Sequence, residues 1–155
     1  MTNVKDTATR QYARLLDSAG QQLANIPALN EGWICTMRKA LGMSAPQLAR
    51  RMGITKPAIY QAERKERTGG VTIQHMEKLA EALGGRFVYA IAPEGSIEDL
   101  LRAQARKKAE STIKRASAHM ALEKQSLTPQ QTQEEIERLA EELLRHRPPD
   151  FWELP

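Results

Sequence analysis

The residues best suited to specific chemistry lie on one face of a short helix expected to begin at Lys56. Spacings of four place Lys56, Tyr60 and Arg64 on this face, beside Pro57 and Gln61. A glutamine can pair with adenine, a lysine can donate to guanine, and proline and tyrosine surfaces can contact thymine methyl groups. The pattern predicts a face that recognises base edges of double-stranded DNA. The alternative is that Tyr60 packs at the edge of the helix and that Gln61 is solvated.

Two short helices joined by a tight turn are expected to hold this face in position. Ser44 begins the first helix, with Gln47 completing a capping box, and Gly53 ends it in a left-handed turn. Ala49 lets the two helices approach closely, and Ile59 fills the space between them. This arrangement is typical of a helix-turn-helix.

Backbone amides at the two helix N-termini and the basic side chains nearby are suited to binding phosphate. The polar residues at these N-termini also cap the helices. The alternative for the basic side chains is that they are only solvated and contact no phosphate. The candidate phosphate contacts are Ser44, Ala45, Gln47, Arg50, Arg51, Thr55, Lys65 and Arg67.

Arg38 and Glu63 are expected to have a structural role. Each follows an inward apolar position, Met37 or Ala62, and therefore lies at the edge of the core, where a charge needs a partner. We predict that they form an ion pair and do not bind DNA.

Helical periodicity predicts a mainly α fold in four parts: an N-terminal helical arm at 1–29, a helix-turn-helix domain at 30–84, a short strand within 85–93 and a C-terminal helical extension at 94–155. Helices outside the motif are expected at about 6–23, 31–41, 72–83, 97–122 and 129–145. The last two are basic and acidic, so they are expected to pair within or between subunits. The expected core of the domain is Ile34, Met37, Ala40, Leu41, Leu48, Ala49, Met52, Ile59, Ala62, Met76, Leu79, Ala80 and Leu83.

Residues 86–92 are aromatic and β-branched, and they lie between two glycines and a proline. They predict one strand, and because the chain offers no second strand, its edge is expected to pair with the same strand of a second subunit. The alternative is a linker whose aromatic rings pack on the core. The pairing residues would be Arg86, Phe87, Val88, Tyr89, Ala90 and Ile91.

The last nine residues carry two aromatic side chains, Phe151 and Trp152. Such a tail either docks on its own fold or is captured by a partner, and we expect docking.

Composition restricts the remaining classes of function. Residues 30–92 contain ten Lys and Arg against five Asp and Glu, so positive charge coincides with the helix-turn-helix, as phosphate neutralisation requires. The single cysteine, Cys35, cannot form an internal disulfide, and no apolar run suggests a signal peptide or a membrane span, so we expect a cytoplasmic protein. The three histidines lack metal-ligand spacing, and neither a nucleotide-binding glycine loop nor a nucleophile elbow occurs; we expect no enzyme activity, metal or cofactor.

Residues 37–63, MRKALGMSAPQLARRMGITKPAIYQAE, resemble the phage-repressor (Xre) class of helix-turn-helix domains. In that class the arginine of the first helix commonly pairs with the glutamate ending the recognition helix, which implies the pair Arg38 and Glu63. The glutamine frequent at the start of the second helix is Ala45 here. The segments GWICTMRKALGMS, GGRFVYAIAP, SIEDLLRAQARKKA and HMALEKQ together resemble the mobile mystery protein A family of small regulators, whose members are typically encoded beside a Fic-domain protein.

The residues predict a homodimeric, sequence-specific transcription regulator, and the resemblance implies that it represses an operon including a Fic-domain protein. Its operator should be an inverted repeat, because a dimer presents two equivalent helices to the DNA. The alternative is an antitoxin, in a toxin-antitoxin system, that neutralises the Fic-domain partner through its C-terminal helices.

Overall fold

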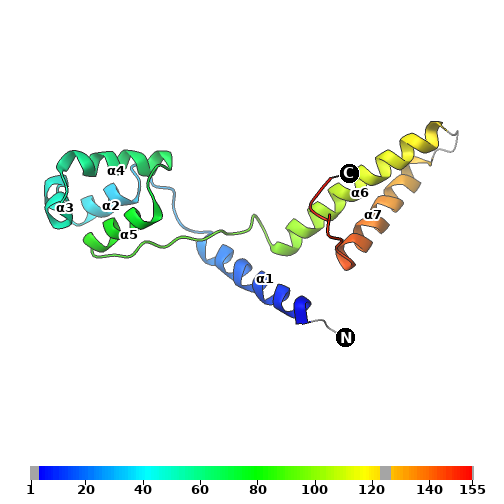
Figure 1. Ribbon diagram of the computed structural model, residues 1–155, viewed down its shortest axis with the longest axis horizontal. Coiled ribbons are helices and arrows are strands. Elements are labelled where there is room, and N and C mark those ends of the chain that lie inside the picture. Colours follow the sequence, from blue (N-terminus) through cyan, green and yellow to red (C-terminus); the bar gives the residue numbers. More distant parts are fainter. Residues whose placement is uncertain (1–3, 123–126, 155) are drawn as a thin grey trace. The chain divides into compact units, whose positions relative to one another are not determined.

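The computed structural model describes residues 4–122 and 127–154 and divides the chain into two compact units. One unit is Asn25–Ala90, and the other combines the described parts of 1–24 and 91–155. Figure 1 shows that the described elements are helices. They are α1 (Val4–Leu23), α2 (Trp33–Ala40), α3 (Ala45–Met52), α4 (Lys56–Thr68), α5 (Ile73–Ala82), α6 (Ile97–Leu122) and α7 (Pro129–Arg145).

The unit Asn25–Ala90 contains α2 to α5, and local capping determines where its helices begin and end. Ser44 Oγ accepts a hydrogen bond from the Gln47 amide, and Gln47 Oε1 accepts one from the Ser44 amide, which completes the predicted capping box. Gly53 ends α3 with φ 68°, in the left-handed region. Thr55 and Thr72 cap α4 and α5 through their side-chain oxygens.

The core of this unit lies where α2, α3, α4 and α5 meet. Leu48, Ile59 and Leu79 are fully buried, and Ala49 is 3% exposed, so the close helix crossing predicted from these residue types is present. Met37, Ala40 and Leu41 were expected in this core, but all three are exposed, Met37 at 37% and Leu41 at 50%. The buried residues of α2, Ile34 and Cys35, lie in its first turn, so its last turn and its C-cap Leu41 stay at the edge of the core. The buried core cluster is Ile34, Ala45, Leu48, Ala49, Ile59, Ala62, Met76, Leu79 and Leu83.

The strand predicted at residues 86–92 is absent from the described residues, which contain helices and irregular segments only. A strand requires a hydrogen-bonded neighbour, and the described part of one chain supplies none. Phe87 packs against the core cluster and its ring stacks on that of Tyr89, with centroids 5.6 Å apart, while Tyr89 stays 60% exposed. Within one chain the segment is therefore closer to the packed linker, and pairing between two subunits stays a prediction.

The second unit is built on α6 and α7, which pack side by side within the chain. Helix α1 contacts α6, and the Asp17 carboxylate accepts a hydrogen bond of 2.9 Å from the Ile97 amide at the start of α6. Thr128 and Gln131 form a second capping box, which starts α7 where the sequence predicts.

The C-terminal tail docks on this second unit, as expected. The Phe151 side chain is 2% exposed, and its carbonyl accepts a hydrogen bond from Gln104 of α6. Lys108, itself buried, donates to the carbonyls of Asp150 and Glu153 and lies 3.2 Å from an Asp150 carboxylate oxygen. One buried lysine thus anchors the tail on α6.

Candidate nucleic-acid interface

One side of α4 presents the five predicted base-reading residues to solvent. Lys56, Pro57, Tyr60, Gln61 and Arg64 are all exposed, and this set is called the base-reading face below. The Lys56 ammonium lies 5.8 Å from the centroid of the Tyr60 ring, which is within the range of a cation–π contact. The opposite side of α4 is buried, so packing fixes which way the base-reading face points.

The N-termini of α3 and α4 lie close in sequence to this face, and several of their polar groups already have partners. The Gln47 and Ser44 amides are used in the capping box, and Thr55 Oγ1 accepts from the Ala58 amide at 3.3 Å. The Ala45 side chain is 1% exposed and belongs to the core. Ala45 can therefore offer a phosphate only its backbone.

The flanking cations differ in what their side chains contact. Arg50, Lys65 and Arg67 are exposed and extend the positive surface beside the helix-turn-helix. Arg51 Nε instead donates to the Ala82 carbonyl at 2.9 Å, the last residue of α5. A cation at a helix C-terminus satisfies a free carbonyl and interacts well with the helix dipole, so Arg51 has a structural role in this unit.

Arg38 and Glu63 form the ion pair that their positions predict. Arg38 Nε donates to Glu63 Oε1 at 2.8 Å, and a second guanidinium nitrogen donates to the Met43 carbonyl at 3.1 Å. Their side chains are only 11% and 7% exposed. The hydrogen bond from the Glu63 carboxylate raises the pKa of Arg38 further above its ordinary value. This pair joins α2 to the buried side of α4.

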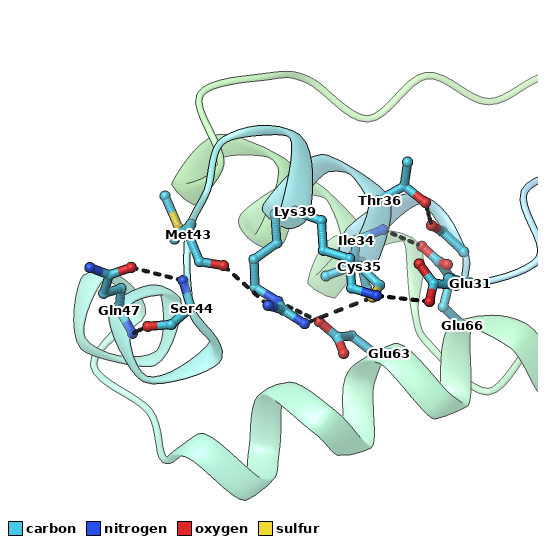
Figure 2. A network of polar contacts seen from close by, with 12 residues as sticks. Glu31, Ile34, Cys35, Thr36, Lys39, Met43, Ser44, Gln47, Glu63 and Glu66 are labelled. Atoms are coloured by element: carbon cyan, nitrogen blue, oxygen red, sulfur yellow. Dashed lines mark hydrogen bonds and ion pairs between the residues drawn. The ribbon is translucent and has the colours of Figure 1, made fainter.

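Glu66 makes a second link between α4 and α2, which the sequence did not indicate. Its carboxylate accepts hydrogen bonds from the Trp33 amide at 2.7 and 3.0 Å and from the Ile34 amide at 3.0 Å, and so caps the N-terminus of α2. Figure 2 shows Glu63 and Glu66 reaching from α4 toward α2. The sequence signal for this link is that Glu66 lies three residues after Glu63, a spacing that places both carboxylates on one side of a helix.

This cap changes the helix boundaries expected from sequence. Helix α4 extends to Thr68 instead of residue 64, and its last turn carries Glu66. Helix α2 begins at Trp33 instead of residue 31, because Glu66 of α4 caps the helix at the Trp33 and Ile34 amides. Gly32, with φ 83° and ψ 170°, is not helical and leads into the helix. Glu31 lies outside the helix and pairs with Lys39 at 2.8 Å. The hydrogen bond from Lys39 lowers the pKa of the Glu31 carboxyl.

Among the described residues, no group of three or more His, Cys, Asp or Glu side chains could hold a metal ion. The part of the chain that the structure describes also contains no helix long and apolar enough to span a bilayer.

Comparison with known proteins agrees with this geometry. Residues 36–89 match a helix-turn-helix family model, which covers most of the unit Asn25–Ala90. The searches of curated proteins and of solved structures found no match. The match supports a DNA-binding regulator with a helix-turn-helix of the Xre type. Membership of the mobile mystery protein A family stays a prediction.

Proposed function

We propose that this protein is a sequence-specific transcription regulator that acts in the cytoplasm by placing α4 in the major groove of DNA. The observation that carries the proposal is the base-reading face, which is exposed while the other side of the same helix is fixed to the core and to α2. A reading helix must present its side chains without losing its orientation, and the two carboxylate links to α2 supply that rigidity.

Base and phosphate contacts would divide between different side chains in this proposal. Gln61 and Lys56 can form hydrogen bonds with base edges, each good bidentate pair being worth about 1 to 3 kcal/mol of discrimination. Arg50, Lys65 and Arg67 would neutralise phosphates and supply affinity that does not depend on sequence. Arg51 uses only Nε on the Ala82 carbonyl, so in this proposal it would reach a phosphate with its two terminal guanidinium nitrogens.

A gel-shift titration on the DNA upstream of the gene tests the proposal. We expect a specific, salt-sensitive shift that the double variant Lys56→Ala, Gln61→Ala loses while keeping weak nonspecific binding. The matched control is Gln74→Ala, Lys78→Ala, which removes the same two residue types from exposed positions of α5. Discrimination that survives in the first double variant, or falls equally in both, contradicts the assignment of the base-reading face.

We further propose that two copies act together as a repressor on an inverted-repeat operator of their own operon. Two reading helices in successive major grooves lie about 34 Å apart. Residues 86–91 are the proposed pairing segment, because they are largely exposed and have no strand partner within the described chain. Light scattering of the intact protein and of Val88→Pro tests this, since proline removes a backbone donor. Two monomers, or two equally stable dimers, would exclude pairing through this segment.

The second candidate function is an antitoxin that binds a Fic-domain protein. The observation that favours this function is the second compact unit, which lies outside the helix-turn-helix. In its C-terminal tail, the apolar side chains of Trp152 and Leu154 are 64% and 49% exposed. Co-purification of the full chain with the neighbouring gene's product tests it. Capture that is lost in Trp152→Ala, Leu154→Ala but kept in Leu41→Ala, Ile73→Ala supports it, and equal capture by both double variants counts against it.

A further inference from the structure

A pocket of about 550 Å³ opens on the unit Asn25–Ala90, beside α2 and α5. Its volume lies within the range of about 300 to 1,000 Å³ typical of small-molecule sites. The side chains of Ile26, Trp33, Met37, Phe87 and Val88 line it. Trp33 and Val88 are 50% and 63% exposed, which leaves a large apolar surface in contact with water. Such surface is costly unless something covers it.

The lining of the pocket limits the chemistry of what can bind there. Its walls are mainly apolar, and Arg86 contributes the single cationic side chain among the described lining residues, none of which is acidic. An apolar body would be recognised by the walls, and a negative headgroup by Arg86. We propose that this pocket binds a small amphipathic acid, a molecule with an apolar body and one carboxylate.

The position of the pocket suggests how such an acid would act on DNA binding, a consequence that rests on the function proposed above. Trp33 and Met37 of α2 form part of its lining, and the same helix is held to α4 by Glu66 at the Trp33 and Ile34 amides and by the pair of Arg38 with Glu63. A ligand that moves α2 therefore acts on the helix that orients α4. The ligand can change the affinity for DNA only if it binds the free and DNA-bound arrangements differently.

The pocket also touches both segments where the chain enters and leaves this unit. Asn25, Ile26 and Pro27 follow the entry point, and residues 85–88 precede the exit after Ala90. A bound molecule would hold these two irregular segments together against α2 and α5. Binding should consequently stabilise the unit as a whole, by mass action on its folded state.

Binding is tested first without DNA, using decanoate as the probe. The chain has two tryptophans, so a Trp152→Phe background leaves Trp33, in the pocket lining, as the reporter of fluorescence. We expect a saturable change in Trp33 fluorescence with decanoate, below the concentration at which it forms micelles. Decanol should bind more weakly and decyltrimethylammonium more weakly still, because neither carries a negative headgroup. No saturable change with decanoate, or equal binding of all three probes, overturns the proposal.

Three variants then locate the site. Ile26→Ser removes apolar lining outside the proposed pairing segment and should weaken decanoate binding about fivefold. Arg86→Gln should weaken decanoate about threefold and leave decanol unchanged, because the pair with an exposed cation is modest. The control is Ile73→Ser, which changes a half-exposed apolar residue of the same unit outside the pocket. Equal effects of Ile26→Ser and Ile73→Ser, with the fold verified by circular dichroism, contradict the site.

The link to DNA is measured last, by repeating the gel shift with and without decanoate. A change of at least about fivefold in the dissociation constant, lost in Ile26→Ser, supports the coupling. If the proposed DNA-binding function is wrong, no specific gel shift appears, but Trp33 fluorescence still reports decanoate binding. If the ligand proposal is wrong, fluorescence does not change, but the gel shift remains. If decanoate has no effect on fluorescence and Ile26→Ser instead converts a dimer to monomers, a second copy of the chain occupies the pocket and the proposal is wrong.

Discussion

Replacement of Gly32 by alanine tests how α2 is held to α4. Gly32 has φ 83° and ψ 170°, a conformation that side chains other than glycine's rarely adopt. A Cβ added there would lie 1.8 Å from Glu66 Oε2 and 2.9 Å from its carboxyl carbon. The Glu66 side chain can move away, but it then gives up its hydrogen bonds to the Trp33 and Ile34 amides.

The expected magnitude combines backbone strain with the loss of the cap. Strain in this region of backbone space costs about 2 kcal/mol, and the loss of a helix N-cap costs about 1 to 2 kcal/mol. We therefore expect Gly32→Ala to lower the free energy of unfolding of this unit by about 3 to 4 kcal/mol. Gly42→Ala is the matched control, because Gly42 also has a positive φ, 64°, but an added Cβ there meets no atom within 4 Å.

Urea denaturation followed by Trp33 fluorescence, in the Trp152→Phe background, measures the change within the unit that contains Trp33. In a Glu66→Ala background the clash is gone, so the cost of Gly32→Ala should fall to the strain alone, about 2 kcal/mol. The reasoning is refuted if Gly32→Ala costs no more than Gly42→Ala. It is also refuted if the cost of Gly32→Ala is the same with and without the Glu66 carboxylate.

Three further predictions concern the charged contacts. Arg38→Met should cost about 3 to 5 kcal/mol of unfolding free energy in urea titrations, because it leaves Glu63 buried without its cation; a smaller cost for this single variant than for a double variant lacking both charges would contradict this. NMR titration should place the pKa of Glu31 below that of an ordinary glutamate, and Lys39→Met should restore the ordinary pKa. Because the pKa of Glu31 is lowered in the folded state, the pair stabilises the fold above the unfolded-state pKa, and this stabilisation is lost as the pH falls through the folded-state pKa. Lys108→Met should speed amide hydrogen exchange of the C-terminal tail while α4 exchanges as before, and an unchanged tail would show that the lysine is not its anchor.

The helix-turn-helix was predictable from sequence because its determinants are local. Ser44 and Gln47 cap each other across three residues, and Gly53 and Ile59 occupy positions that the turn and the helix crossing require. Arg38 and Glu63 are 25 residues apart, yet each lies beside an inward apolar position, so their pairing followed from burial. Signals of this kind need only helical periodicity and the cost of an unpaired buried charge.

The features that the sequence did not indicate depend on partners fixed only by the folded chain. Glu66 caps a helix that begins 33 residues before it, and Arg51 bonds a carbonyl 31 residues after it. The strand expected at residues 86–92 failed for a related reason. Its aromatic and β-branched composition describes a local preference, whereas a strand exists only with a hydrogen-bonded neighbour.

The two sides of α4 should therefore respond differently to substitution. Helical geometry places Lys56, Tyr60 and Arg64 toward solvent, while Glu63 and Glu66 face α2. Because the side chains of the base-reading face take no part in the links to α2, the DNA sequence recognised under the proposed function can change at little cost in stability. A change at Glu66 acts in the opposite way, since it loosens α2 and the orientation of α4 without altering any base contact. Gln61→Ala should thus change which DNA is bound at an unchanged unfolding free energy, whereas Glu66→Ala should weaken binding to all sequences together with the fold.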